Sequence, residues 1–183
     1  MTDQQQGIPY KLERIHADTM TPIGIFKQLS GQKKFLLESS FEHEKKGKYS
    51  YLGVQPYQEV LGFNNQTTVI NLLDHTKRTY DMDAIHYLKE HFPKLELDLP
   101  LPFPGGAIGY IGYDTVRTIE PIGEEQHDEL KMPDVHLMIY DELIIYEHTT
   151  ESVYLLVINR NNDPESILDT RLKSLKKRLS GRT

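Results

Sequence analysis

The sequence predicts an α+β fold built mainly on antiparallel sheet, with a few flanking helices in a layered arrangement. Apolar, strand-like runs cluster along the chain and lack the regular strand–helix alternation that marks parallel α/β folds. Helical spacing of apolar residues occurs in only a few stretches, which fits helices that flank a sheet. A chain of 183 residues is long enough to bury the core of one ordinary domain, so residues 1–183 are expected to form a single domain.

The first third of the chain predicts three strands and one short helix. Thr21-Pro22 supplies an N-cap followed by proline at the first helical position, and the helix is expected to end near Leu29. Gly31 suits the stop that follows the helix. The strands expected here cover residues 10–15, 35–39 and 49–54, with a charged loop over residues 42–48.

Later elements follow from turn and cap signals. Asn64-Asn65 tolerates positive φ and predicts a β-hairpin between the runs on either side of it. Apolar residues at helical spacing predict a helix up to Phe92, with Asp81 or Asp83 as its cap. Asp163-Pro164 predicts the start of a C-terminal helix. The remaining strands are expected over residues 57–62, 67–73, 77–80, 135–140, 143–146 and 153–159.

Composition excludes several classes of function. The chain has no cysteine, which rules out disulfides, thiolate metal sites and cysteine nucleophiles, and fits a reducing compartment; a cytoplasmic location is therefore expected. No apolar run approaches the length of a membrane span, and the first residues show no signal pattern. The formal net charge of −6 gives no electrostatic footprint for nucleic acid. The basic residues of the C-terminal helix are interpreted as a solvated face: Arg171, Lys173, Lys176, Lys177 and Arg178.

The run from Gly105 to Asp114 concentrates four glycines and two tyrosines in ten residues. Its spacing departs from the G-x-G-x-x-G fingerprint of dinucleotide sites, and no long amphipathic helix follows it. Glycines in a strand permit bulges and the close approach of another backbone, so we interpret the run as a structural strand that crosses a packed sheet. No Walker A, H-E-x-x-H or G-x-S-x-G motif is found, and the histidines are scattered among polar residues. The sequence therefore offers no catalytic residues and no metal site.

The run Phe35-Leu36-Leu37-Glu38-Ser39 places a carboxylate and a hydroxyl at the end of an apolar strand. Alternation along a strand points Leu37 and Ser39 to one side, and Leu36 and Glu38 to the other. A partly buried carboxylate needs a partner. That partner is either a nearby cation such as Lys48 or the ammonium group of a ligand, and the residues alone leave both alternatives open.

Four blocks in this order resemble the N-terminal region of anthranilate synthase component I, over roughly residues 8–160. The blocks are Phe35-Leu36-Leu37-Glu38-Ser39, Tyr49-Ser50-Tyr51-Leu52-Gly53, Phe103-Pro104-Gly105-Gly106 with Gly109-Tyr110 and Tyr113-Asp114, and Pro133-Asp134-Val135. The family converts chorismate and ammonia, supplied by a glutamine amidotransferase partner (component II), to anthranilate and pyruvate. Tryptophan inhibits that step, which requires Mg²⁺.

The resemblance implies a regulatory rather than a catalytic part. In the family, the catalytic and Mg²⁺-binding residues belong to a C-terminal chorismate-binding domain, which is expected to be absent from this chain. The chain is therefore expected to be inactive alone, to need no cofactor, and to have as partners L-tryptophan, the amidotransferase component and that missing domain. Two alternatives stay open: the N-terminal domain of aminodeoxychorismate synthase component I, and a stand-alone module that binds an aromatic amino acid.

The resemblance also assigns roles to five residues of a tryptophan-binding site. It implies that Glu38 faces the tryptophan ammonium, that Ser39 lines the pocket, and that Leu37 packs on the indole. The physical chemistry agrees, since a carboxylate balances an ammonium and an aliphatic side chain covers an apolar ring. The resemblance also places Lys48 and Ser50 at this site. In the family, a short segment of the catalytic domain completes the pocket.

Overall fold

The computed structural model describes residues 10–17, 20–38, 47–92, 99, 101–103, 105–118 and 132–179. Its strands form two antiparallel five-stranded sheets, which confirms the α+β class. The chain divides into two compact units, where the sequence predicts one domain. Unit 1 comprises Met1–Gln55, Leu95–Gly106 and Tyr140–Thr183, and unit 2 comprises Pro56–Lys94 and Ala107–Ile139. Both units are discontinuous in sequence.

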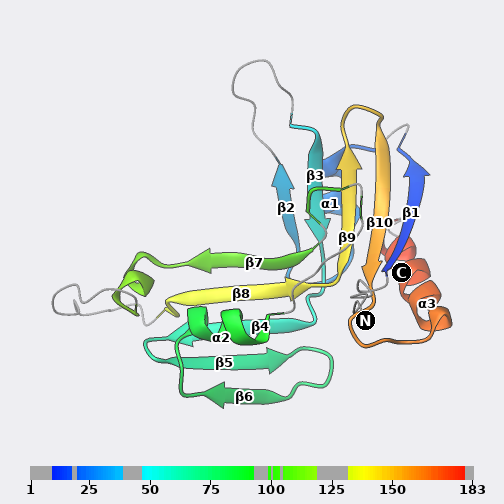
Figure 1. Ribbon diagram of the computed structural model, residues 1–183. Helices are drawn as coiled ribbons and strands as arrows, with labels where there is room; N and C mark the ends of the chain where they lie inside the picture. Colours follow the sequence, from blue (N-terminus) through cyan, green and yellow to red (C-terminus); the bar gives the residue numbers. More distant parts are fainter. Residues whose placement is uncertain are drawn as a thin grey trace, which may run out of the picture. The chain divides into compact units, whose positions relative to one another are not determined.

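The sheet of unit 1 has the strand order β1-β10-β9-β3-β2, with every neighbouring pair antiparallel (Figure 1). Its central strands β9 and β10 are apolar on both faces and almost entirely buried. Such strands read as continuous apolar runs, which is why the sequence located them well. The strands are β1 (Tyr10–His16), β2 (Phe35–Glu38), β3 (Tyr49–Gly53), β9 (Glu142–Glu147) and β10 (Ser152–Ile158).

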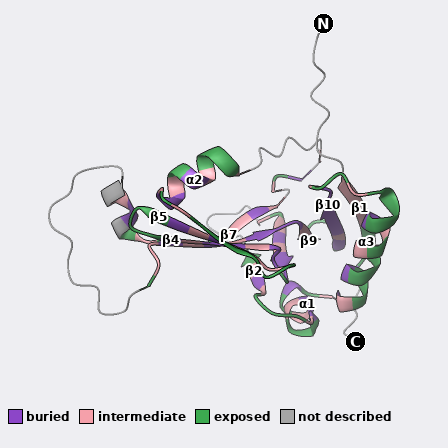
Figure 2. Cartoon of the chain, turned by 90° about the horizontal axis from the view of Figure 1, so that it is seen from below, coloured by how far each residue is buried: buried purple, intermediate pink, exposed green. Residues whose placement is uncertain are grey.

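Two helices belong to unit 1. Helix α1 (Pro22–Gln28) begins as predicted, since the Thr21 hydroxyl accepts a hydrogen bond from the amide of Gly24. Helix α3 (Glu165–Leu179) contacts β10 and β1, whereas α1 contacts β2 and β3. In Figure 2 the exposed side of α3 faces away from the strands.

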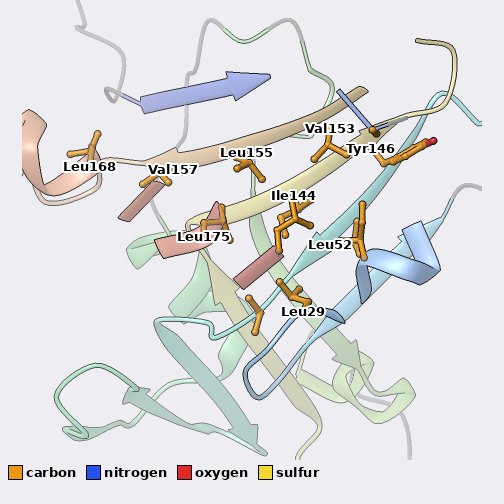
Figure 3. Close-up of a cluster of buried hydrophobic side chains, with 13 residues drawn as sticks. Leu29, Leu52, Ile144, Tyr146, Val153, Leu155, Val157, Leu168 and Leu175 are labelled. Atoms are coloured by element: carbon orange, nitrogen blue, oxygen red, sulfur yellow. The ribbon is translucent and has the colours of Figure 1, made fainter. Parts of the chain in front are cut away.

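The core of unit 1 forms where these helices meet one face of the sheet (Figure 3). Alternate residues of β9 and β10 supply the sheet side, and the leucines along one side of α3 supply the helix side, from Leu168 to Leu179. Burial of this apolar area is the main stabilising term for the unit. The labelled members in Figure 3 are Leu29, Leu52, Ile144, Tyr146, Val153, Leu155, Val157, Leu168 and Leu175.

The basic residues of α3 are less exposed than the sequence suggested. Arg171 is half-buried and forms ion pairs with Asp141 and Glu142, each at 2.9 Å. Lys176 pairs with Glu13 of β1. Because the helix lies over acidic residues of two strands, part of the face that was predicted to be solvated instead forms ion pairs with the sheet.

The sheet of unit 2 has the strand order β6-β5-β4-β8-β7. The predicted hairpin is confirmed: Phe63 and Gln66 are paired across a two-residue turn in which Asn64 has φ +48°. The strands are β4 (Gln58–Phe63), β5 (Gln66–Asn71), β6 (Lys77–Tyr80), β7 (Gly106–Ile111) and β8 (Val135–Tyr140). A short 3₁₀ helix, η1 (Tyr113–Thr118), follows β7.

Helix α2 (Ala84–His91) covers one face of this second sheet. Of the two predicted caps, Asp83 is the one used, and its carboxylate accepts hydrogen bonds from the amides of Ile85 and His86. The helix packs on a cluster of buried residues from β4, β5, β8, the helix itself and the position just before β4: Tyr57, Val60, Val69, Ala84, Tyr87, Val135, Leu137 and Ile139.

Residues 106–111 of the glycine-rich run form strand β7, as the structural interpretation predicts, but the strand lies at the edge of its sheet and the end of the run belongs to η1. A Cβ atom on Gly109 would lie 1.9 Å from the carbonyl oxygen of His136 in the neighbouring strand β8. No side chain fits in that space. Gly106 has φ +146°, a conformation that favours glycine. The glycines are therefore explained by strand packing.

Candidate functional site

Four of the five residues assigned by resemblance, Leu37, Glu38, Lys48 and Ser50, lie at one end of the unit 1 sheet. Strand β2 ends at Glu38, β3 begins at Tyr49, and β9 ends at Glu147, and these three strands are neighbours (Figure 1). The register brings the same ends together, because Glu38 pairs with Ser50 and Tyr49 pairs with Glu147. We call this group of strand ends the β2–β3–β9 end.

Leu37 and Glu38 lie at the last two positions of β2. The predicted alternation holds here, since Leu36 packs against the core of unit 1 whereas Leu37 is 44% exposed. Glu38 is exposed, so the expectation of a partly buried carboxylate is wrong. The edge position of β2 explains the difference, because the strand has a neighbour on one side only.

Lys48 does not pair with Glu38, which was one of the two partners considered for that carboxylate. Its ammonium nitrogen lies 3.4 Å from Oε1 of Glu147 and 5.0 Å from the ring centre of Tyr49. The hydrogen bond with the Tyr49 hydroxyl, and then the one with Glu147, raise the pKa of Lys48. More than half of the Lys48 side chain remains exposed, so its charge is accessible to solvent.

Glu147 is the buried charge of this region, with a side chain only 9% exposed. Its Oε2 accepts hydrogen bonds from the hydroxyls of Thr150 at 2.8 Å and Tyr154 at 3.0 Å. Burial alone would raise the pKa of this carboxyl, but the hydrogen bonds from Thr150, Tyr154 and Lys48 outweigh it, and the pKa is lowered. The carboxylate is therefore ionised at neutral pH.

Ser50 is fully buried at the second position of β3. Its hydroxyl oxygen lies 2.7 Å from Nε2 of His148, in a hydrogen bond whose donor depends on the histidine tautomer. The amide of His148 also donates to the carbonyl oxygen of Lys48 at 2.9 Å. The side chain of Ser50 is thus occupied by a neighbour within the fold.

Aromatic rings line the other side of β3. The rings of Tyr49 and Tyr51 are 6.2 Å apart, and the Phe103 ring meets Tyr51 edge-on at 5.2 Å. Burial, and next the neighbouring Tyr49, raise the pKa of the Tyr51 phenol, which stays neutral. The β2–β3–β9 end therefore combines an exposed carboxylate, an exposed ammonium and partly covered apolar surface.

Ser39 lies outside the described residues, so the structure says nothing about its place. In the part of the chain that the structure describes, no group of three or more acidic or histidine side chains could hold a metal ion. Within the same residues, no helix is both long and apolar enough to cross a membrane.

Sequence reasoning missed Glu147 and His148. Glu147 was just beyond the predicted strand over residues 143–146, and His148 was counted among scattered polar histidines. The available signal was the change from an apolar strand to two adjacent polar residues, Glu147 and His148. Their importance depends on the pairing of β3 with β9, almost a hundred residues apart, which the sequence does not display.

Comparison with known proteins identifies the family. The family model described as chorismate binding enzyme matches residues 32–180. The chain belongs to this family. That match covers β2, β3, β9 and the rest of the β2–β3–β9 end, so the site lies inside the family's own region.

The curated relatives of this family member confirm the resemblance to anthranilate synthase component I. "Anthranilate synthase component 1" of Acetivibrio thermocellus is 34% identical over 154 residues, covering 82% of this chain and 31% of the relative. The protein of the same name from Lactococcus lactis is 30% identical over 152 residues, covering 81% of this chain and 32% of the relative. The chain thus spans about a third of the length of these relatives.

A solved structure agrees. The crystal structure of anthranilate synthase component I from Streptococcus pneumoniae TIGR4 matches with a TM-score of 0.62 and 26% identity. The match covers 91% of this family member and 36% of the solved chain. The likeness therefore extends over nearly the whole of this chain and a minor part of the neighbour.

Proposed function

We propose that this chain is the regulatory, N-terminal part of an anthranilate synthase component I and contributes part of its tryptophan pocket. One observation carries the proposal: the exposed carboxylate of Glu38 and the exposed ammonium of Lys48 lie at the same strand ends, the carboxylate on the Leu36 side of the sheet and the ammonium on the Tyr49 side. A free amino acid is a zwitterion, and its two charges need one partner of each sign.

The apolar part of the ligand has a counterpart as well. Leu37 leaves 44% of its surface exposed on the side of the sheet that carries Tyr51 and Lys48, and an indole would cover such a surface favourably. The roles follow: Glu38 binds the ammonium, Lys48 the carboxylate, Leu37 and Ser39 line the pocket, and Ser50 belongs to its wall. In the assembled enzyme the partners are the chorismate-binding domain and the glutamine amidotransferase component, and Mg²⁺ belongs to the former.

Tryptophan titration of the ¹⁵N-labelled chain tests this proposal. We expect amide shifts at Glu38 and Lys48, with a dissociation constant near the millimolar range, because a pocket missing its second wall loses about 3–5 kcal/mol of contacts. Glu38→Ala removes the ammonium partner and is expected to weaken binding about tenfold or more. Ser39→Phe fills the pocket and should do the same.

Glu90→Ala on α2 is the matched control, because it removes an exposed carboxylate from the other unit. Its affinity is expected to equal that of the wild type. If tryptophan moves no amide of the β2–β3–β9 end, or if Glu38→Ala binds as tightly as the wild type, the pocket is not here. Phenylalanine should bind more weakly, because it buries less apolar surface.

A second candidate is the corresponding part of an aminodeoxychorismate synthase component I. The supporting observation comes from one organism: the Bacillus subtilis "Aminodeoxychorismate synthase component 1" is 31% identical, whereas its "Anthranilate synthase component 1" is 26% identical. The same titration separates the two, since tryptophan is the end product of the anthranilate branch alone. A stand-alone sensor would instead bind tryptophan at micromolar concentration.

A further inference from the structure

Strand β7 lies at an edge of the unit 2 sheet (Figure 1). In the part of the chain that the structure describes, β8 is its only neighbour, and the other side of the strand is open. An open strand edge presents amide and carbonyl groups that can pair with another strand. The second half of β7 is accessible to such a partner, since Gly109, Tyr110 and Ile111 are all exposed.

The composition of β7 differs from that of the other edge strands. Natural sheets protect an open edge with charged residues or proline, and β7 contains neither. The other edge strands each carry charged residues, which are Lys11, Glu13 and Arg14 in β1, Glu38 in β2, and Lys77 and Arg78 in β6. Among these edges, β7 therefore has the composition of a strand that is paired.

Exposed apolar side chains gather at the same edge. Tyr110 and Ile111 are 37% and 56% exposed, and Tyr113, at the start of η1, is 89% exposed. The Tyr110 ring packs edge-on against the ring of His136 in β8, with 5.9 Å between the ring centres. Single exposed apolar residues are common on protein surfaces, whereas a group of them marks an interaction surface. A strand added to this edge would cover part of that apolar surface.

The residues around Tyr110 are complementary to themselves when the strand is reversed. If two copies of β7 pair antiparallel about Tyr110, each tyrosine lies opposite its counterpart, and Ile111 lies opposite Gly109 of the second copy. The large side chain then meets a position that has none, and the two-fold axis repeats this contact. Aromatic pairs across antiparallel strands stabilise a sheet. Because β7 has no charged residue, the pairing brings no like charges together within the strands.

We propose that this chain forms a symmetric dimer through β7, in which the open edges of two copies pair antiparallel about Tyr110 and join the two unit 2 sheets into one. The occupant of the edge is a second copy, because the same few residues supply both halves of a complementary contact. The surface includes no residue of the β2–β3–β9 end, so the dimer does not depend on tryptophan binding. An interface of this size buries little area, and we expect a dissociation constant of about 10–100 μM.

Sedimentation velocity of the 183-residue chain, at about 5 to 500 μM, measures the monomer–dimer equilibrium. Tyr110→Lys and Tyr110→Glu each place like charges opposite one another, and each is expected to weaken dimerisation about tenfold or more. An equimolar mixture of the two variants places opposite charges together and is expected to restore the dimer. Leu73→Lys is the matched control, because it replaces an apolar residue that is 71% exposed and lies outside β7, and it should dimerise like the wild type.

Cysteine cross-linking tests the register of the two strands. The chain has no cysteine of its own, so Tyr110→Cys introduces a single thiol. Directly opposed residues of antiparallel strands have Cβ atoms about 4.5–5.5 Å apart, which a small movement brings within the range of a disulfide. We expect Tyr110→Cys to form a covalent dimer under mild oxidation about tenfold faster than Leu73→Cys, whose thiol lies away from the paired edge.

Several outcomes would overturn the dimer. A wild-type chain that stays monomeric over the whole concentration range has another partner at β7 or none. A dimer that persists unchanged in both charge variants uses another surface, and equal rates of cross-linking in the two cysteine variants exclude pairing about Tyr110. If thermal melts show that the Tyr110 variants do not fold, Ile111→Asp replaces them at a position that is 56% exposed, and unchanged dimerisation in that variant overturns the proposal. The tryptophan titration tests the proposed pocket separately.

Discussion

Glu147 keeps a negative charge in a nearly buried position at the end of β9. Its hydrogen bonds from Thr150, Tyr154 and Lys48 stabilise the ionised form more than burial opposes it. The folded pKa therefore lies below the ordinary value of 4.5. A group of this kind stabilises the fold above its unfolded pKa, and the contribution is lost as the pH falls through the folded pKa.

Glu147→Gln tests this sign. We expect the wild-type free energy of unfolding to fall as the pH is lowered from about 6 to 3, and the fall to be smaller in Glu147→Gln, because the amide does not titrate. Urea unfolding at several pH values measures it, with exposed Glu151→Gln as the control. Equal pH dependence in the wild type and in Glu147→Gln would contradict the assignment.

For single residues, the sequence predicted the features that depend only on nearby residues in the chain, such as side-chain direction along a strand and helix capping. The outward direction of Leu37 and the inward direction of Leu36 followed from strand alternation, and Asp83 was one of two predicted caps. The exposure of Glu38 and the partner of Lys48 were not predictable, because both depend on which strands are neighbours. The same holds for the bond between Ser50 and His148, which joins residues 98 positions apart.

Strand β7 depends on the absence of a side chain at Gly109. At Gly109 the neighbouring strand β8 comes so close that a Cβ atom would lie 1.9 Å from a backbone carbonyl oxygen. Backbone atoms cannot rotate away as a flexible side chain can. Any larger residue must therefore push β7 and β8 apart and break the pairing between them.

Gly109→Val is expected to destabilise the protein by more than about 2 kcal/mol, which corresponds to a loss of about 5 °C or more in Tm. Ile111→Val places the same residue on the same strand at a position that is 56% exposed, and should change Tm little. Thermal melts of the two variants provide the comparison. A Gly109→Val protein that melts with the wild type but loses binding would make this glycine functional instead.

The sequence predicted where the helices and strands lie along the chain better than it predicted which strands pair with one another. Strands β9 and β10 gave continuous apolar runs, and the β4–β5 hairpin gave a turn signal, so their places along the chain were close to correct. The order β1-β10-β9-β3-β2 was not predictable, because pairing between β1 and β10 leaves no mark in either run. The ion pairs that fasten α3 to its sheet were missed for the same reason.

At the scale of the whole molecule, the chain belongs to the chorismate binding enzyme family and spans about a third of the length of its relatives. We expect this chain alone not to convert chorismate, since no cluster of possible Mg²⁺ ligands is found among the described residues and the resemblance assigns catalysis elsewhere. Incubation with chorismate, Mg²⁺ and ammonium, followed by anthranilate fluorescence, measures it. Sustained fluorescence that scales with pure protein would show that residues 1–183 hold a complete active site.

The pairing of the first described strand with the last has a consequence on the ribosome. Strand β1 pairs with β10, so its edge stays unpaired until roughly 140 further residues have been made. At bacterial or eukaryotic rates of translation this takes about 7–30 s. Unit 2 needs nothing beyond Ile139 and can close earlier. During that interval β1, β2 and β3 lack their central neighbours, and an unpaired strand edge is the kind of surface that chaperones recognise and that aggregates in crowded cells.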